Sequence, residues 1–225
     1  ANTIDVLNAK QYATYFREGR RHEILSQYPP GTNIPEELMN TLIDKAYPFN
    51  PDTLGTGTDW MNEIFQVAPM EQHNLSIQGG TEKTKVYSSA SYLNQDGIVG
   101  GSKANFNRIT ARLNLDHEVK DWFDIGTNIS FTHYKRKELN ENNEFGGVIS
   151  NAMAIDPLTP LYVDELDDLP SKYIQQIENN IDNPENSSLR APGDKGYYGM
   201  SRYVQNEIAN PVAQINNDHG RWTQD

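Results

Sequence analysis

An acidic cluster in the second half of the chain offers oxygen ligands of the kind that bind Ca²⁺. The cluster consists of Asp164, Glu165, Asp167 and Asp168, and carboxylate oxygens are the donors that calcium prefers in proteins. Its spacing lacks the loop pattern and the turn glycine of an EF-hand. Asp164, Asp167 and Asp168 are therefore weak calcium candidates, and a solvated acidic loop is the favoured interpretation.

Other residue types that could do chemistry are present without the spacing that chemistry needs. The chain has no cysteine, so it carries neither a disulfide framework nor a thiolate. Its histidines lie far apart without zinc-site spacing, at positions His22, His73, His117, His133 and His219. Two glycine pairs lack the flanking residues of a phosphate-binding loop, namely Gly79-Gly80 and Gly100-Gly101. We therefore expect no enzyme and no cofactor.

Aromatic residues beside asparagines and aspartates are candidates for binding a ligand. Aromatic rings can stack on sugars, and the neighbouring polar groups can hydrogen-bond hydroxyls or peptide groups. The candidates in the polar segments are Trp60, Tyr162, Tyr197, Tyr198 and Tyr203. The alternative is that these rings pack the loops themselves, and Trp60 is the first candidate for that structural role.

The composition argues against a nucleic-acid partner and against a transmembrane helix. The 225 residues carry a net charge of -12, which repels a phosphate backbone, so we expect no nucleic-acid partner. No run of apolar residues is long enough for a transmembrane helix. A mean hydropathy of -0.74 still leaves a β-barrel open, because barrel strands alternate between apolar and polar residues.

Strand-like alternation dominates the middle of the chain. Between Asn105 and Val119 the odd positions from Ile109 to Leu115 are apolar and the even positions are polar. The segment 123–134 repeats the pattern, and two weaker strands precede them near 73–80 and 85–95. A side-chain period of two is typical of strands, and glycine-rich or short polar turns separate these segments. The sequence therefore predicts an antiparallel meander of four strands.

Two interpretations of this meander remain open. A soluble sheet would turn its apolar face to a core, whereas a membrane barrel would turn Ile109, Leu113, Ile129 and Phe131 to lipid and its polar face to a lumen. Arg108, Arg112 and Asp116 on one strand suit a hydrated lumen, and Trp122-Phe123 at a strand end suits an aromatic girdle.

Helical patterns precede the strands, and a long polar segment follows them. We expect one helix at about 6–18, with Asp5 as N-cap and Gly19 as its stop, and a second at 35–46 that begins with Pro35. The stretch 47–70 has no sustained period and predicts a structured loop. The segment from 137 to about 220 is far longer than ordinary connections, which indicates a functional loop.

Several motifs in this order resemble one family of proteins. They are Leu7-Asn-Ala-Lys-Gln-Tyr12, Asp59-Trp60, His73-Asn-Leu-Ser-Ile-Gln-Gly-Gly80, Tyr92-Leu-Asn-Gln-Asp-Gly-Ile-Val99, Arg112-Leu-Asn-Leu-Asp116, Gly126-Thr-Asn128, Ile155-Asp-Pro-Leu-Thr-Pro160 and Asn210-Pro-Val-Ala213. Together they resemble the start of the barrel in SusC/RagA-family TonB-linked outer-membrane transporters, and the match runs from about residue 4 to the end.

The resemblance implies an all-β fold class: an antiparallel transmembrane β-barrel segment with long extracellular loops carrying short helices. Residues 1–70 would form the first extracellular loop, 71–136 four barrel strands, 137–220 a long extracellular loop and 221–225 the start of the next strand. The turn at Gly80–Lys83 would then be periplasmic.

The resemblance also implies partners and a location. It implies the outer membrane of a Gram-negative bacterium, contact with the lipid bilayer, and a SusD-like surface lipoprotein as partner. It further implies an oligosaccharide or peptide as cargo, and energy from the TonB complex through regions absent here. A soluble or secreted all-β glycan-binding module is the alternative.

Overall fold

The computed structural model describes residues 4–141, 143, 146–179, 188–204, 208–217 and 221–224. The chain folds as two compact units. The helical unit comprises Ala1–Ile64 and Asn142–Gln214, and the sheet unit comprises Phe65–Glu141 and Ile215–Asp225. Among the described residues, none of the helices combines the length and apolar character that a membrane crossing requires.

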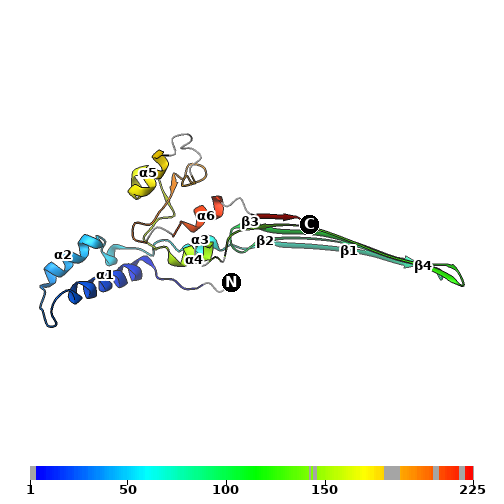
Figure 1. Ribbon diagram of the computed structural model, residues 1–225, viewed down its shortest axis with the longest axis horizontal. Helices are drawn as coiled ribbons and strands as arrows, with labels where there is room; N and C mark the ends of the chain where they lie inside the picture. Colours follow the sequence, from blue (N-terminus) through cyan, green and yellow to red (C-terminus); the bar gives the residue numbers. More distant parts are fainter. Residues whose placement is uncertain are drawn as a thin grey trace. The chain divides into compact units, whose positions relative to one another are not determined.

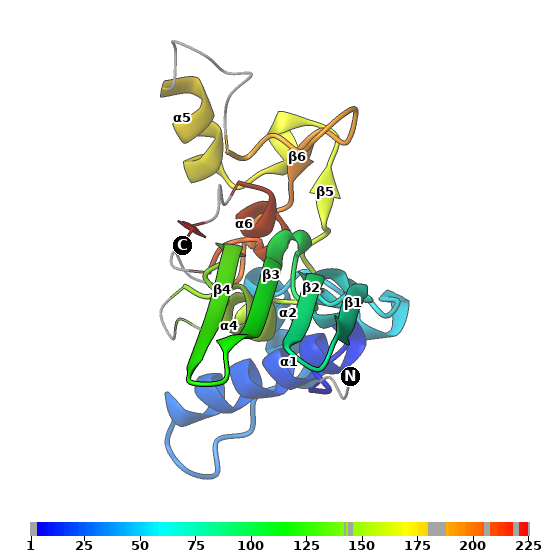
Figure 2. The ribbon, with the colours of Figure 1, turned by 90° about the vertical axis from the view of Figure 1, so that its right-hand side faces the viewer.

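The sheet unit is an antiparallel meander of long strands. Strands β1 (Met70–Gly80), β2 (Thr84–Gly97), β3 (Gly101–Lys120) and β4 (Phe123–Glu138) are neighbours in space in the same order as in sequence. Figure 1 shows their length, and Figure 2 shows them side by side. A short strand, β7 (Arg221–Gln224), pairs with the end of β4. The four strands predicted from alternation are confirmed.

The register of the sheet gathers its apolar side chains on one face. Leu113 pairs with Ser88 on one side and with Ile129 on the other, and directly paired residues share a face of an antiparallel sheet. By the same pairing, this face also carries Leu75, Ile77, Val86, Ala90, Ile109, Ala111, Leu115, Ile125 and Phe131. The opposite face is mainly polar and includes Asn74, Ser76, Lys85, Ser89, Arg108, Arg112, Asp116, Asn128 and Ser130.

The apolar face of the sheet stays open to its surroundings. Ile77 is 67% exposed, Ile129 is 55% exposed and Phe131 is 58% exposed. These values are high for side chains of this size, which soluble proteins rarely gather in a contiguous exposed patch. Among the described residues, no hydrophobic core therefore covers these side chains.

Two antiparallel helices begin the helical unit. They are α1 (Ala9–Ser26) and α2 (Glu36–Ala46). Ile24 packs with Met39 and Ile43 in a small buried cluster between them. Bidentate hydrogen bonds of 2.8 and 2.7 Å from Arg21 to Glu36 join their outer surfaces.

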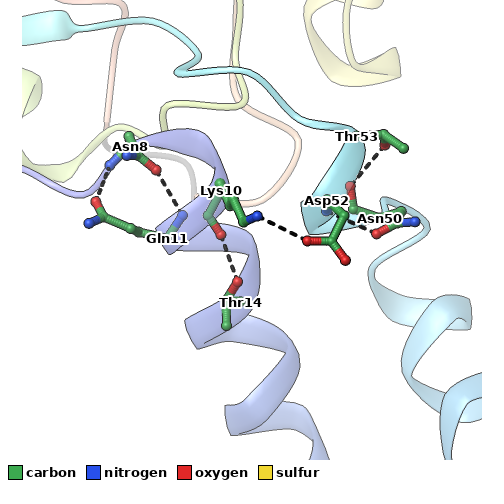
Figure 3. Close-up of polar contacts among 7 residues, drawn as sticks. All are labelled: Asn8, Lys10, Gln11, Thr14, Asn50, Asp52 and Thr53. Atoms are coloured by element: carbon green, nitrogen blue, oxygen red, sulfur yellow. Dashed lines mark hydrogen bonds and ion pairs between the residues drawn. The ribbon is translucent and has the colours of Figure 1, made fainter.

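The first helix begins and ends later than its sequence pattern predicts. The N-cap is Asn8, whose side chain accepts from the Gln11 backbone N–H while the Gln11 side chain accepts from the Asn8 N–H (Figure 3). This capping box satisfies amide groups that Asp5 would leave unpaired. Gly19 lies inside α1, because the burial of Ile24 against α2 outweighs the weak helix propensity of one glycine. Pro35 is the N-cap of α2 rather than its first residue.

The two segments expected to be loops contain further helices and strands. The stretch 47–70 holds η1 (Pro51–Thr53) and α3 (Trp60–Ile64). The long segment after β4 holds α4 (Val148–Ala154), β5 (Tyr162–Val163), η2 (Leu166–Asp168), α5 (Ser171–Asn179), β6 (Tyr197–Tyr198) and α6 (Pro211–Asn217). Their apolar islands are too short for a period to show in sequence.

The fold is therefore an antiparallel sheet combined with a helical unit, which confirms the predicted antiparallel meander but does not confirm the all-β class. Within the described residues the sheet is open, since its order runs β1-β2-β3-β4-β7 without closure. A closed barrel is therefore a hypothesis, in which this sheet forms one part of the barrel wall. Long helices such as α1 form because their buried side chains meet partners elsewhere in the helical unit.

Candidate functional site

Asp156 organises the centre of the helical unit. Its carboxylate is fully buried and accepts hydrogen bonds of 2.9 Å each from the backbone N–H and the hydroxyl of Thr159. The hydroxyl of Ser201 donates a third, short bond to the same carboxylate. A buried carboxylate requires such donors, because leaving it unpaired is costly. Asp156 therefore ties the 155–160 segment to the chain around residue 201.

Asn210 makes a second fully buried connection. Its amide nitrogen donates to the carbonyls of Leu161 and Gly199 at 3.1 and 2.9 Å. Its side-chain oxygen accepts from the backbone N–H groups of Val212 and Ala213 at 3.0 and 3.1 Å. Asn210 thus caps the start of α6 and fastens it to the β5 and β6 segments.

Gly199 allows these two segments to approach each other closely. Its N–H donates to the Leu161 carbonyl at 3.0 Å, and a Cβ atom at this position would lie 1.8 Å from the Pro160 carbonyl oxygen. No side chain fits there. Two of the sequence motifs, Ile155–Pro160 and Asn210–Ala213, are therefore parts of one framework.

An aromatic cluster lies beside this framework. The rings of Tyr12 and Phe16 stack at 4.2 Å, and Phe16 meets Tyr47 edge-on at 5.8 Å. Tyr203 joins the cluster, 5.4 Å from Phe49 and 6.3 Å from Tyr47. Burial, followed by the negative charge of Asp156, raises the pKa of the Tyr12 phenol above its ordinary value, and the same two causes raise the pKa of Tyr203.

A cleft of about 590 Å³ opens next to the cluster. Its walls combine apolar side chains with charged groups: Phe49, Leu54, Leu158, Thr159, Pro160, Tyr162, Val163, Asp164, Asp168, Met200, Arg202 and Tyr203. Its volume is in the range of small-ligand sites, which are mostly apolar with a few placed polar groups. We treat this cleft as the candidate binding site.

The structure separates the aromatic candidates into two groups. Tyr162 and Tyr203 line the cleft. Trp60 is 1% exposed and donates a hydrogen bond of 2.9 Å to the Asp156 carbonyl, so its role is structural. Tyr198 is also 1% exposed, and Tyr197 packs against the cluster around Leu169 and Tyr173. Neither of these two tyrosines lines the cleft.

The calcium candidates are only partly brought together. Asp164 and Asp168 line the cleft, whereas Asp167 is exposed and outside its lining. Over the part of the chain that the structure describes, no three His, Asp or Glu side chains are arranged to hold a metal ion. The acidic residues that are neighbours in the sequence therefore do not form a set of metal ligands among the described residues.

Sequence reasoning missed most of the cleft. Arg202 and Met200 lie in a segment without periodicity, and Phe49 and Leu54 lie in the stretch between α2 and α3. Besides the candidates Tyr162, Tyr203, Asp164 and Asp168, the motif Ile155–Pro160 was a local signal, since Leu158, Thr159 and Pro160 also line the cleft.

Comparison with known proteins identifies the relatives of this chain. It is 37% identical over 117 residues to the TonB-dependent receptor SusC of Bacteroides thetaiotaomicron. The aligned region covers 51% of this chain and 11% of SusC. It is also 28% identical over 189 residues to the TonB-dependent receptor P3 of Formosa agariphila. That aligned region covers 81% of this chain and 15% of P3. No family model matches the chain.

Among solved structures, the RagAB peptide importer in its open-open state resembles this chain with a TM-score of 0.49 and 21% sequence identity, over 72% of this chain and 19% of that one.

The sequence relatives of this chain are thus TonB-dependent receptors, SusC among them, which confirms the resemblance to the SusC/RagA family that its motifs predict. The chain spans 11% to 15% of the length of SusC and P3.

Proposed function

We propose that this chain forms part of the wall and outer surface of a TonB-dependent transporter in the outer membrane. Strands β1 to β4 cross the membrane, with the apolar face against lipid and the polar face toward a hydrated lumen. The single observation that carries this proposal is the exposed apolar face, continuous in register over all four strands. Lipid is the surrounding that such a face fits.

The height of the apolar face supports a membrane crossing. On β4 the apolar positions run from Phe123 to Phe131, which is about 27 Å along a strand at about 3.4 Å per residue. After the usual tilt of barrel strands this becomes about 20 Å, close to the apolar band of about 25 Å in such barrels. Trp122, which is 79% exposed, stands at one end of it, where interfacial aromatics are common.

The helical unit takes the role of the extracellular loops in this proposal. It would help to capture an oligosaccharide or peptide, with the 590 Å³ cleft as the contact site. A SusD-like lipoprotein would cover it from outside, and TonB would supply energy through residues beyond this chain. The names of the relatives, all TonB-dependent receptors, support the transport class.

Cell fractionation of the native organism tests the location. We expect peptides such as ITARLNLDHEVK from β3 in the outer-membrane fraction, within a polypeptide several times heavier than 25.5 kDa. A species near 25.5 kDa in the soluble fraction would contradict the proposal and favour a glycan-binding module. Deleting TonB should abolish uptake of the cargo while leaving the receptor in the membrane.

A further inference from the structure

The cleft beside Tyr203 has a chemistry that distinguishes between the two classes of cargo. Its lining includes the apolar, non-aromatic side chains of Leu54, Leu158, Val163 and Met200. Charged groups of both signs stand among these residues, with the carboxylates of Asp164 and Asp168 and the guanidinium of Arg202. This combination is unlike a flat aromatic platform for a sugar ring.

The aromatic rings of the cleft already have partners within the protein. The ammonium of Lys195 lies 4.8 Å from the centre of the Tyr162 ring, over its face. Tyr203 packs against Phe49 at 5.4 Å with the rings at 89°. Sugar recognition depends on an accessible ring face, and these contacts reduce what both tyrosines can offer.

Arg202 is held in place by the main chain and keeps donors for a ligand. Its Nη2 donates to the Asp168 carbonyl at 2.7 Å, which is its single hydrogen bond among the contacts of the described residues. A guanidinium has further N–H donors in a planar fork that matches a carboxylate. The main-chain bond fixes this fork without neutralising its charge.

We propose that this cleft binds a short zwitterionic peptide, with an apolar side chain against the apolar lining residues, its carboxylate at Arg202 and its amino group at Asp164 and Asp168. This specificity rests on the proposed capture role of the helical unit. A neutral glycan would cover the guanidinium and the two carboxylates without bringing a counter-charge to either, which is unfavourable when water is displaced. A zwitterionic peptide supplies both counter-charges, and its apolar side chain can contact the apolar lining residues.

The test uses the full receptor purified in detergent and a mixed-sequence tetrapeptide library, with free termini or with C-terminal amides. We expect the free peptides to bind at least tenfold tighter than the amidated ones, because a charge-assisted pair is lost. Arg202→Gln should weaken free peptides by about tenfold and remove the difference between the two libraries. Maltotetraose, a neutral glycan, should not compete.

The control is Arg190→Gln, which removes an exposed arginine of the same helical unit outside the cleft lining. It should leave both affinities unchanged. Equal binding of free and amidated peptides, no peptide binding at all, or competition by maltotetraose would overturn the peptide specificity. None of these results would affect the membrane proposal, which fails separately if the receptor is recovered outside the outer membrane.

Discussion

The indole N–H of Trp60 donates a hydrogen bond of 2.9 Å to the main-chain carbonyl of Asp156, 96 residues further along the chain. The bond joins α3 to the segment whose carboxylate also holds Thr159 and Ser201. Thr58 adds a parallel contact, since its hydroxyl donates to the Thr159 carbonyl at 2.8 Å. These hydrogen bonds thus help to join the two separate stretches of the helical unit.

Replacing Trp60 with phenylalanine tests this connection. Trp60→Phe removes the N–H and leaves the Asp156 carbonyl without that partner, which should cost about 1–3 kcal/mol of local stability. Hydrogen exchange of the amides in 155–161 should become faster in the purified receptor. Trp122→Phe is the matched control, because Trp122 is 79% exposed. Unchanged exchange in Trp60→Phe would show that the indole hydrogen bond does not stabilise this connection.

Gly57 should not tolerate a side chain. Its φ is +73°, and a Cβ atom would lie 2.3 Å from the Pro157 carbonyl oxygen and 2.6 Å from the Ala9 Cβ. Gly57→Ala should therefore destabilise the helical unit by about 2–4 kcal/mol, seen as faster limited proteolysis. Gly55→Ala has open space around the new methyl group and should behave like the wild type. Equal proteolysis of the two variants would contradict the close approach.

The capping box of α1 makes a smaller, local prediction. Asn8→Ala removes the acceptor for the Gln11 N–H, a bond of 2.9 Å, and should cost about 1 kcal/mol. Amide exchange in the first turn of α1 should accelerate while α2 is unchanged. Asn8→Asp retains a capping oxygen and should preserve protection. The reverse order of the two variants would argue for another N-cap.

The buried tyrosine makes the helical unit sensitive to alkaline pH. Burial raises the pKa of Tyr12, so its phenol ionises more readily in the unfolded chain than in the folded one. The neutral, buried phenol therefore contributes its full stabilisation of the folded state below the unfolded pKa of about 10. This contribution is lost as the pH rises above that value. Thermal unfolding of wild type should therefore weaken above about pH 10 more steeply than that of Tyr12→Phe. Parallel pH profiles would exclude this cause.

A pair of adjacent residues on β4 separates the two faces of the sheet. Ile129 pairs with Leu113 on the apolar face, whereas Asn128 pairs with Asn114 on the polar face. Under the membrane proposal, Ile129→Lys should cost about 2–4 kcal/mol near the middle of the bilayer and lower the amount of receptor in the outer membrane. Asn128→Lys should be tolerated, because it faces the lumen. Similar abundance of both variants would argue against lipid on the apolar face.

Local pattern was informative where the structure is locally periodic. The alternation around Ile109 and Leu113 predicted β3, and the observed pairing with β2 and β4 confirms the two faces. The ends of α1 were predicted wrongly, because capping depends on which neighbouring side chain reaches the free amides, and Asn8 does so with Gln11. The helices after β4 were missed, since their few apolar residues meet partners outside each helix.

Neighbouring residues were enough to predict the family resemblance, the four strands and the two faces of the sheet, because each of these is a local pattern. The burial of Trp60, and the placing of Tyr162 and Tyr203 in a cleft with Arg202, follow from the three-dimensional fold alone. The reason is separation along the chain: Ser201 lies 45 residues from Asp156, and Asn210 lies 49 residues from Leu161. A local pattern shows which side chains alternate along a strand. It does not show which distant segment each buried polar side chain hydrogen-bonds.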